Sequence, residues 1–302
     1  MIESRIKHIE TLPDLCKLAG LPPPEHPLIG IIRLEDIPII GIDLGSLSFG
    51  FYSISLKRNL KGYIEYGRKQ YDFQEGLLGF VAPNQAITFD QCDATNSSGW
   101  ELYFESDLLA NSKLATDIQR YGFFNYETSE ALHVSKKEED QIDQIFQNIY
   151  DEYSLPIDQF SKEVILSNLE LLLTYSKRFY QRQFITRNEV DSSVVSNFEK
   201  ELNAYFSIED LQASGIPGVS YFSDKLSLSS KYLSDLLKTL TGKTTKEHIQ
   251  FQLLKKAKHL ILGTDKSVAE IAYQLGFEYP QYFSRFFKEK TGESPKEYRM
   301  NK

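Results

Sequence analysis

The chain has 302 residues, 41% of them hydrophobic and 13% aromatic, so it is long and apolar enough to form two domains with their own cores. It contains no run of about 18 uncharged apolar residues and no N-terminal apolar run suited to export, so we expect a cytoplasmic protein without a membrane partner. The formal net charge of -8 argues, taken alone, against a nucleic-acid-binding protein.

Residues 29–104 are predicted to form strands, because short apolar or alternating runs recur between turn residues. The predicted strands are Ile29–Leu34, Phe49–Leu56, Gly62–Tyr66, Gln70–Phe73, Leu77–Phe80, Ala86–Phe89 and Gly99–Phe104. Within this region, Tyr63–Phe73 has the alternating faces of a hairpin. Many short strands at this spacing indicate an all-β barrel or sandwich.

The pattern becomes helical near Ser135, which precedes Glu138 with the spacing of a capping box. One helix follows, and Pro156 interrupts it. A second, longer helix is predicted from about Ile157 to Arg182. Its apolar face is so wide that it must be buried, either on the chain's own barrel or, in the interpretation that we favour, on a second subunit.

Residues 186–196 are polar and are the best candidate for a linker between domains. An amphipathic helix follows, with Val195, Phe198, Leu202 and Phe206 on its apolar face. Two glycines then separate this helix from the last quarter of the chain.

That last quarter contains one helical unit twice. Tyr232–Gly242 and Tyr282–Gly292 share Tyr, Ser, Lys, Thr and Gly in register, and exchanges between Leu and Phe keep the apolar face. A repeat that preserves a buried stripe and an exposed polar face indicates one structural unit used twice. Both copies have the organisation of a helix-turn-helix, a unit that reads one groove of DNA.

The charge distribution agrees with this interpretation. From Lys225 to Lys302 the chain has 15 basic and 8 acidic residues, whereas residues 1–224 have 19 basic and 34 acidic residues. A basic end attached to an acidic remainder is typical of a DNA-binding domain joined to a regulatory domain. A solvated basic surface would give the same balance, and the repeat decides between the two.

In the first unit, Val219–Leu226 is predicted to be a short positioning helix. The reading helix follows at about residues 230–241, with Ser229 capping its start and Gly242 ending it. A connecting helix from Thr244 to about Leu262 would be roughly 28 Å long. That length is close to the roughly 34 Å of one DNA turn, so a rigid helix could hold two readers near successive major grooves.

The second unit begins with another capping-box spacing at Ser267–Glu270. Its reading helix is predicted at about Pro280–Lys290, and a last short helix is capped at Ser294. From Ser267 to Arg299 the chain reads Ser-Val-Ala-Glu-Ile-Ala-x-x-Leu-Gly-Phe-x-x-x-x-Tyr-Phe-Ser-Arg-Phe-Phe-Lys-x-x-x-Gly-x-Ser-Pro-x-x-Tyr-Arg. This pattern resembles the signature of the AraC/XylS family of transcription regulators.

The resemblance covers about residues 195–302 and is most specific in the second unit. It implies a sequence-specific regulator of transcription that binds double-stranded DNA, with RNA polymerase as a further partner and, from family habit, activation rather than repression. The implied base contacts are Lys231, Ser234, Asp235, Gln281, Ser284 and Arg285. The implied phosphate contacts are Ser229, Ser230, Lys238, Lys243 and Lys288, together with helix N-termini.

Two positions depart from the family pattern. Tyr279 replaces a small capping residue, so the helix start must rely on Pro280 at the first helical position. Asp235 stands where relatives have a basic or neutral side chain, although a carboxylate can accept a hydrogen bond from a cytosine amino group. For Arg285 we expect a guanine contact, and the alternative is a salt bridge to Glu289 on the same helix.

The resemblance also implies a cupin-like N-terminal barrel that binds a small effector, followed by a helical pair for dimerisation. Many cupin enzymes hold a metal through closely spaced histidines, whereas the five histidines here are scattered, at His8, His26, His133, His248 and His259. We find no P-loop, nucleophile elbow or Cys/His cluster, and Cys16 and Cys92 favour reduced thiols. We therefore expect no catalytic residue, metal or cofactor, and the effector-binding residues stay unassigned.

Together these observations predict a multidomain α+β protein with a cupin-like antiparallel β-barrel and a tandem helix-turn-helix domain. The predicted parts are the barrel domain at 1–134, the helical pair at 135–185, the linker at 186–196 and the all-α domain at 197–302, with units at 219–242 and 267–292. We predict a homodimeric regulator controlled by an effector. The alternatives are control by a protein partner on the acidic barrel, or a cupin-type enzyme with a DNA-binding tail. A ligand-shaped cavity would favour the effector.

Overall fold

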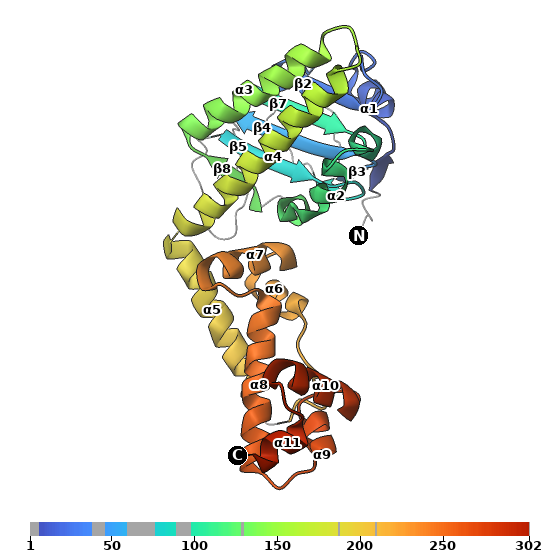
Figure 1. Ribbon diagram of the computed structural model, residues 1–302. Helices are drawn as coiled ribbons and strands as arrows, with labels where there is room; N and C mark the ends of the chain where they lie inside the picture. Colours follow the sequence, from blue (N-terminus) through green and yellow to red (C-terminus); the bar gives the residue numbers. More distant parts are fainter. Residues whose placement is uncertain are drawn as a thin grey trace. The chain divides into compact units, whose positions relative to one another are not determined.

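The computed structural model describes residues 6–37, 46–58, 76–88, 98–127, 130–186, 188–208 and 210–301. The chain forms two compact units, Met1–Thr186 and Arg187–Lys302, and each has its own core (Figure 1). The predicted hairpin at Tyr63–Phe73 lies outside the described residues. None of the described helices combines the length and apolar character needed to cross a bilayer.

The N-terminal unit contains two sheets. The larger one is fully antiparallel and has the strand order β2 (Ile29–Arg33), β7 (Ser98–Phe104), β4 (Tyr52–Arg58), β5 (Gly76–Val81) and β8 (Leu132–Val134). The smaller one consists of β1 (Lys7–Ile9), β3 (Ser46–Phe49) and β6 (Ala86–Thr88), with β1 parallel to β3. The expected barrel is therefore not what these strands form: across the described ranges, the two sheets do not close.

The predicted strand Phe49–Leu56 is divided between β3 and β4 by a turn at Gly50 and Phe51. The Gly50 amide donates to the carbonyl of Ile9 at 2.9 Å, and a side chain at Gly50 would lie 2.5 Å from the oxygen of Glu10. The turn therefore depends on the N-terminal segment, in which no local sequence pattern indicated a helix or a strand. That segment also contributes helix α1 (Leu12–Ala19), which Thr11 caps.

Helices α3 (Lys136–Tyr153) and α4 (Ser161–Thr186) lie across one face of the larger sheet (Figure 1). The Ser135 amide donates to the Glu138 carboxylate at 2.9 Å, as the capping-box spacing predicts. Helix α4 begins four residues later than predicted, because the carboxylate of Asp158 accepts from the amides of Phe160 and Ser161 and so caps the helix start.

Most of the apolar side chains of α4 are buried within its own chain, whereas Val164, Leu171 and Ile185 are exposed. Leu169, Leu172, Leu173 and Phe179 are almost completely buried, because α4 packs against α3 and β8. Of the two partners considered for this face, the chain's own sheet and helix are therefore the ones observed.

The C-terminal unit is all-helical. Its helices are α5 (Asn188–Phe206), α6 (Val219–Leu226), α7 (Ser230–Thr241), α8 (Thr245–Gly263), α9 (Val268–Gln274), α10 (Pro280–Thr291) and α11 (Pro295–Met300). Most of the segment predicted to be a linker is therefore helical, since residues 188–196 form the first half of α5. Polar composition suggested a linker, but the segment contains neither glycine nor proline to break a helix.

Candidate nucleic-acid interface

The C-terminal unit has two hydrophobic cores that share helix α8. Ile249 of α8 belongs to the first core, with α5, α6 and α7. Leu253, Ala257 and Ile261 of the same helix belong to the second core, with α9 and α10. Figure 1 shows α8 running from the α6–α7 pair to the α9–α11 group. One continuous helix therefore positions both helix-turn-helix units.

The loop between α5 and α6 also connects the two units. The amide of Leu211 donates to the carbonyl of Gln274 at 2.8 Å, and Ile216 packs against both cores. Gly276, at the turn of the second unit, has φ +84° and would place a side chain 2.8 Å from the backbone of Gly215. Only glycine combines that backbone conformation with so close an approach.

In the first unit, α7 spans the predicted range. The Ser229 hydroxyl accepts from the amide of Tyr232 at 3.1 Å, which is the predicted cap. Leu233, Leu236 and Leu237 are buried. The opposite face of α7 carries the predicted DNA contacts, of which Ser230, Lys231 and Lys238 are exposed and Ser234 and Asp235 are half-buried.

Two of these predicted contacts are paired with each other. The ammonium group of Lys231 lies 2.9 Å from the carboxylate of Asp235, one helical turn further on. The hydroxyl of Ser230 lies 2.9 Å from that of Ser223 on α6, and Lys243 stands 4.4 Å from the ring centre of Phe251. Because of the first of these contacts, the carboxylate of Asp235 neutralises the ammonium group of Lys231 on the same face of α7.

In the second unit, α10 begins at Pro280, and Tyr279 provides no side-chain cap, as predicted. Phe283 and Phe287 are fully buried and Phe286 is partly buried. The predicted contacts lie on the other side of the helix: Gln281, Arg285 and Lys288 are exposed, and Ser284 is half-buried.

Arg285 has no ion pair or hydrogen bond with any residue that the structure describes. The expected alternative, a salt bridge to Glu289, is not formed, and the cation near Glu289 is Lys290, at 3.9 Å. The guanidinium group is thus free to bind an external partner. Lys231, another of the six predicted base contacts, is by contrast paired with Asp235.

An exposed aromatic pair lies at the start of α10, and neither residue is among the predicted DNA contacts. Tyr279 is 48% exposed and Tyr282 is 55% exposed, and their rings meet edge to face with centres 5.6 Å apart. The signal was present in the sequence, because the two tyrosines are three residues apart and lie outside the stripe of buried phenylalanines.

One histidine and two glutamates near the helix ends of the C-terminal unit have pKa values below their ordinary range. Burial, and then the nearby Lys243, lower the pKa of His248 below its ordinary value. His248 lies 2.7 Å from the hydroxyl of Thr241, at the end of α7. At the starts of α8 and α9, hydrogen bonds from the capping residues lower the pKa of Glu247 and Glu270, so both carboxylates stay ionised at neutral pH.

A family model described as a helix-turn-helix domain matches residues 222–301, which run from within α6 to the end of α11. This chain carries an AraC/XylS-family helix-turn-helix domain. The matched residues lie within the region, about residues 195–302, that the sequence pattern assigned to this family.

Relatives of the AraC-type domain occur in proteins of different overall design. Histidine kinase P4 of Formosa agariphila is 32% identical over 132 residues, which are 43% of this chain and 9% of the kinase. The transcriptional activator RhaR of Yersinia pestis is 28% identical over 139 residues, 46% of this chain and 44% of RhaR. RhaS of an Enterobacter species is 39% identical over 80 residues, 26% of this chain and 29% of RhaS.

Among solved structures, the C-terminal domain of the response regulator yesN of Fusobacterium nucleatum is 33% identical. The alignment covers 34% of this chain and 98% of that domain, with a TM-score of 0.30. This chain spans less than half of the length of each of the three curated relatives, the histidine kinase, RhaR and RhaS. The family-model match at residues 222–301 lies within the C-terminal unit.

Proposed function

We propose that this protein is a sequence-specific DNA-binding regulator of transcription whose two helix-turn-helix units read successive major grooves. The observation that carries the proposal is helix α8, which contributes side chains to both cores. Its 19 residues correspond to roughly 28 Å, and one turn of DNA is about 34 Å. A helix packed at both ends keeps the two reading helices at a fixed spacing.

Within this proposal, α10 is the stronger reader. Arg285 has no partner in the described chain, and a free guanidinium group on a reading helix suits the N7 and O6 atoms of guanine. Gln281 and Ser284 complete the base contacts of α10. In α7, the base contacts are Ser234 and the Lys231–Asp235 pair, which presents a donor and an acceptor side by side.

The remaining predicted residues bind phosphate in this proposal. Lys238 and Lys243 are exposed in the first unit, and Lys288 is exposed in the second. Ser229 and Ser230 stand at the start of α7, where backbone N–H groups and the helix dipole attract phosphate. These contacts set affinity and its salt dependence and carry no sequence information.

The rest of the proposal concerns control. RhaR and RhaS are described as transcriptional activators, which supports an activator role. In this proposal the protein acts in the cytoplasm and engages RNA polymerase, as the resemblance to the family implies. The N-terminal unit, which lies outside the family-model match at residues 222–301, is the regulatory part, and it acts by binding a small effector without any catalytic step. A cavity in this unit favours an effector over a protein partner.

We also propose that the protein is a homodimer. Leu155, Ile157, Phe160 and Val164 form an exposed apolar tip where α3 connects to α4, and a second copy would cover it. Light scattering after gel filtration measures the mass. A Phe160→Glu variant is expected to be monomeric, and a monomeric parent chain would contradict this part of the proposal.

Recovery of bound genomic DNA tests the main function. The protein is mixed with fragments of its host genome at near-physiological salt, because low salt inflates nonspecific phosphate binding, and the retained fragments are sequenced. We expect sites with two conserved segments about one helical turn apart. Uniform retention of unrelated fragments would overturn sequence-specific reading.

A further inference from the structure

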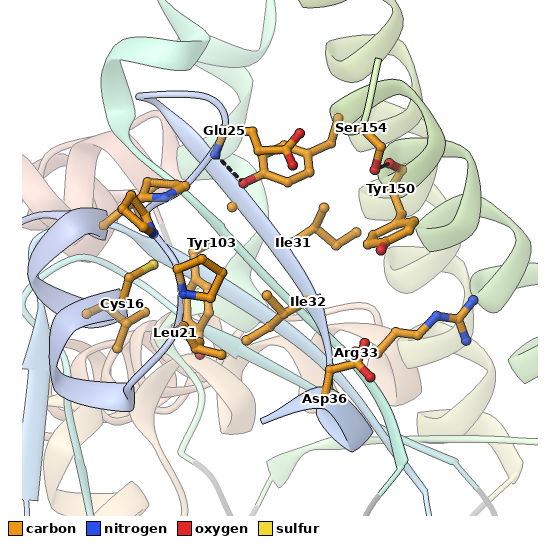
Figure 2. Close-up of a pocket in the computed structure, with 17 residues that line it drawn as sticks. Cys16, Leu21, Glu25, Ile31, Ile32, Arg33, Asp36, Tyr103, Tyr150 and Ser154 are labelled. Carbon is orange, nitrogen blue, oxygen red and sulfur yellow. Dashed lines mark hydrogen bonds between the residues drawn. The ribbon is translucent and has the colours of Figure 1, made fainter. Parts of the chain in front are cut away.

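The N-terminal unit contains a cavity of about 270 Å³ beside the edge strand β2. Helix α1 and residues 21–25 form one side of it, and the last turn of α3 forms the other. Figure 2 shows Cys16 and Leu21 on the first side and Tyr150 and Ser154 on the second, with Ile31 and Ile32 between them. The cavity is therefore built by three segments that are far apart in sequence.

Gly30 of β2 keeps this cavity open. A side chain at Gly30 would meet nothing within 4 Å. A glycine inside a strand weakens it by roughly 0.5–1 kcal/mol relative to alanine, and such glycines usually mark a bulge, a bend or the close approach of a ligand or backbone. The β2–β7 register is continuous from Ile29 to Arg33, and Gly30 is not among the residues with positive φ.

Cross-strand packing does not explain Gly30 either. Tyr103 is its direct partner on β7, and an aromatic ring can lie over a glycine and protect it. Here no atom of Tyr103 comes within 4 Å of the position that a Gly30 side chain would occupy. Neither the backbone conformation nor cross-strand packing therefore accounts for the glycine, whose Cβ position faces open space.

The lining indicates the chemistry of a molecule that the cavity would accept. Leu12, Leu15 and Ile32 provide aliphatic surface, and Tyr103, Tyr150 and Tyr153 provide aromatic rings. The Tyr103 hydroxyl forms no hydrogen bond with any described residue, and burial raises its pKa well above the ordinary value. It therefore stays protonated and can donate one hydrogen bond.

The α3 side of the cavity is fixed in place. The hydroxyl of Tyr153 accepts from the amide of Glu25 at 2.8 Å, which ties the end of α3 to the proline-rich segment (Figure 2). Arg33 donates to Gln147 of α3 and stands 4.3 Å from the ring centre of Trp100. An occupant would touch α3 without having to order it first, which lowers the entropic cost of binding.

We propose that this cavity binds a compact small molecule with an aromatic or branched aliphatic body and one hydrogen-bond acceptor, which Tyr103 engages. Gly30 provides the space, and α1 and α3 provide the walls. That the molecule is the effector of transcription control rests on the proposed function. Binding itself does not, because it is measured without DNA.

Disulfide exchange at Cys16 tests the site, because its thiol lines the cavity. In a Cys92→Ser chain, Cys16 is equilibrated with equal amounts of benzyl and 2-hydroxyethyl disulfides under mild reducing conditions, and mass spectrometry measures the two conjugates. Burial of the benzyl ring should favour its conjugate by about tenfold or more. Equal amounts of the two conjugates would overturn the proposal.

Filling the cavity provides the matched control. Gly30→Val places a β-branched side chain in the open space, and Gly30→Ala places one methyl group there. We expect the benzyl preference to fall stepwise, to about twofold or less in Gly30→Val, with unchanged circular dichroism. A preference that persists in both variants would mean that the ring binds outside the cavity. Gly30→Ala decides the matter if Gly30→Val does not fold.

The two proposals can fail separately. If benzyl conjugation is selective and also changes retention of the recovered genomic sites, the cavity is the effector site. If selectivity is present and DNA retention is unchanged, the cavity binds ligands but the effector role is wrong. If no specific DNA is retained at all, the proposed function fails while the exchange result stands.

Discussion

Tyr232 and Tyr282 occupy equivalent positions in the two reading helices but have different surroundings. Tyr232 of α7 is 6% exposed, whereas Tyr282 of α10 is 55% exposed. Tyr282 instead meets Tyr279, the residue just before α10. The repeated sequence thus provides a buried ring in one unit and a surface ring in the other.

This difference predicts opposite effects of one substitution. Tyr232→Ala should lower the free energy of unfolding by roughly 3 kcal/mol, as the loss of a buried aromatic side chain does. Tyr282→Ala should leave it within about 0.5 kcal/mol and weaken DNA binding by about tenfold. Urea unfolding and fluorescence titration with a recovered site measure the two effects. If Tyr282→Ala binds the recovered site as tightly as the parent protein does, the aromatic pair does not contact DNA.

Arg285→Ala should reduce affinity for the recovered site by about 1–3 kcal/mol and relax the preference at one base pair. The reason is that its guanidinium group has no partner among the described residues and is available to a base edge. Competition binding against single-base variants of the site measures the preference. Lys288→Ala is the control, since loss of a phosphate contact weakens all sequences alike. An equal loss on specific and random DNA for Arg285→Ala would contradict base reading.

Gly276→Ala should destabilise the C-terminal unit more than Gly242→Ala. Both glycines have positive φ, at +84° and +78°, so alanine is strained at both by about 1–2 kcal/mol. Only at Gly276 would the added carbon meet backbone, that of Gly215 at 2.8 Å, which adds about 1–3 kcal/mol. Thermal unfolding of the two variants measures the difference. Equal melting temperatures would mean that the 211–215 loop moves away without cost.

Stability should fall as the pH drops below about 6.5, partly because of His248. Burial lowers its pKa in the folded chain, so below pH 6.5 the unfolded chain binds a proton that the folded chain does not. Since stability rises with pH wherever the unfolded state holds more protons, this contribution is full above 6.5 and declines until the folded pKa is passed. His248→Gln should show a shallower decline in urea unfolding between pH 7.5 and 5.

The helices of the AraC-type domain could be predicted closely because their ends are encoded locally. Ser229, Thr244, Ser267 and Ser294 each accept a hydrogen bond from an amide three residues later, and a cap of this kind is visible as a sequence spacing. The buried leucines and phenylalanines follow the helical period, so the exposed face of each reading helix could be deduced as well.

The N-terminal unit was harder to predict because its structure depends on distant contacts. Strand β1 has three residues and pairs in parallel with β3, about forty residues further on, which no local pattern indicates. The turn at Gly50 depends on Ile9. The cavity beside Gly30 could not be foreseen for the same reason, since α1, β2 and α3 must all be in place before it exists.

The details of the DNA-binding face were only partly accessible from sequence. The Lys231–Asp235 pair follows from spacing alone, because residues four apart on a helix are neighbours. The contact between Ser230 and Ser223 joins two helices and required the turn geometry. Residues 188–196 are helical although their polar composition suggests a linker, because they contain no helix-breaking glycine or proline.

Because both cores are built on α8, the two readers can change in different ways over evolutionary time. A surface substitution on α7 or α10 alters what one reader prefers without affecting the other. A single residue inserted in α8 would rotate one reader by about 100° against the other and advance it by about 1.5 Å, so that both could no longer face the same side of DNA. Single substitutions can therefore change the base preference of such a protein step by step, whereas the distance between the two DNA segments that it reads stays fixed by the length of α8.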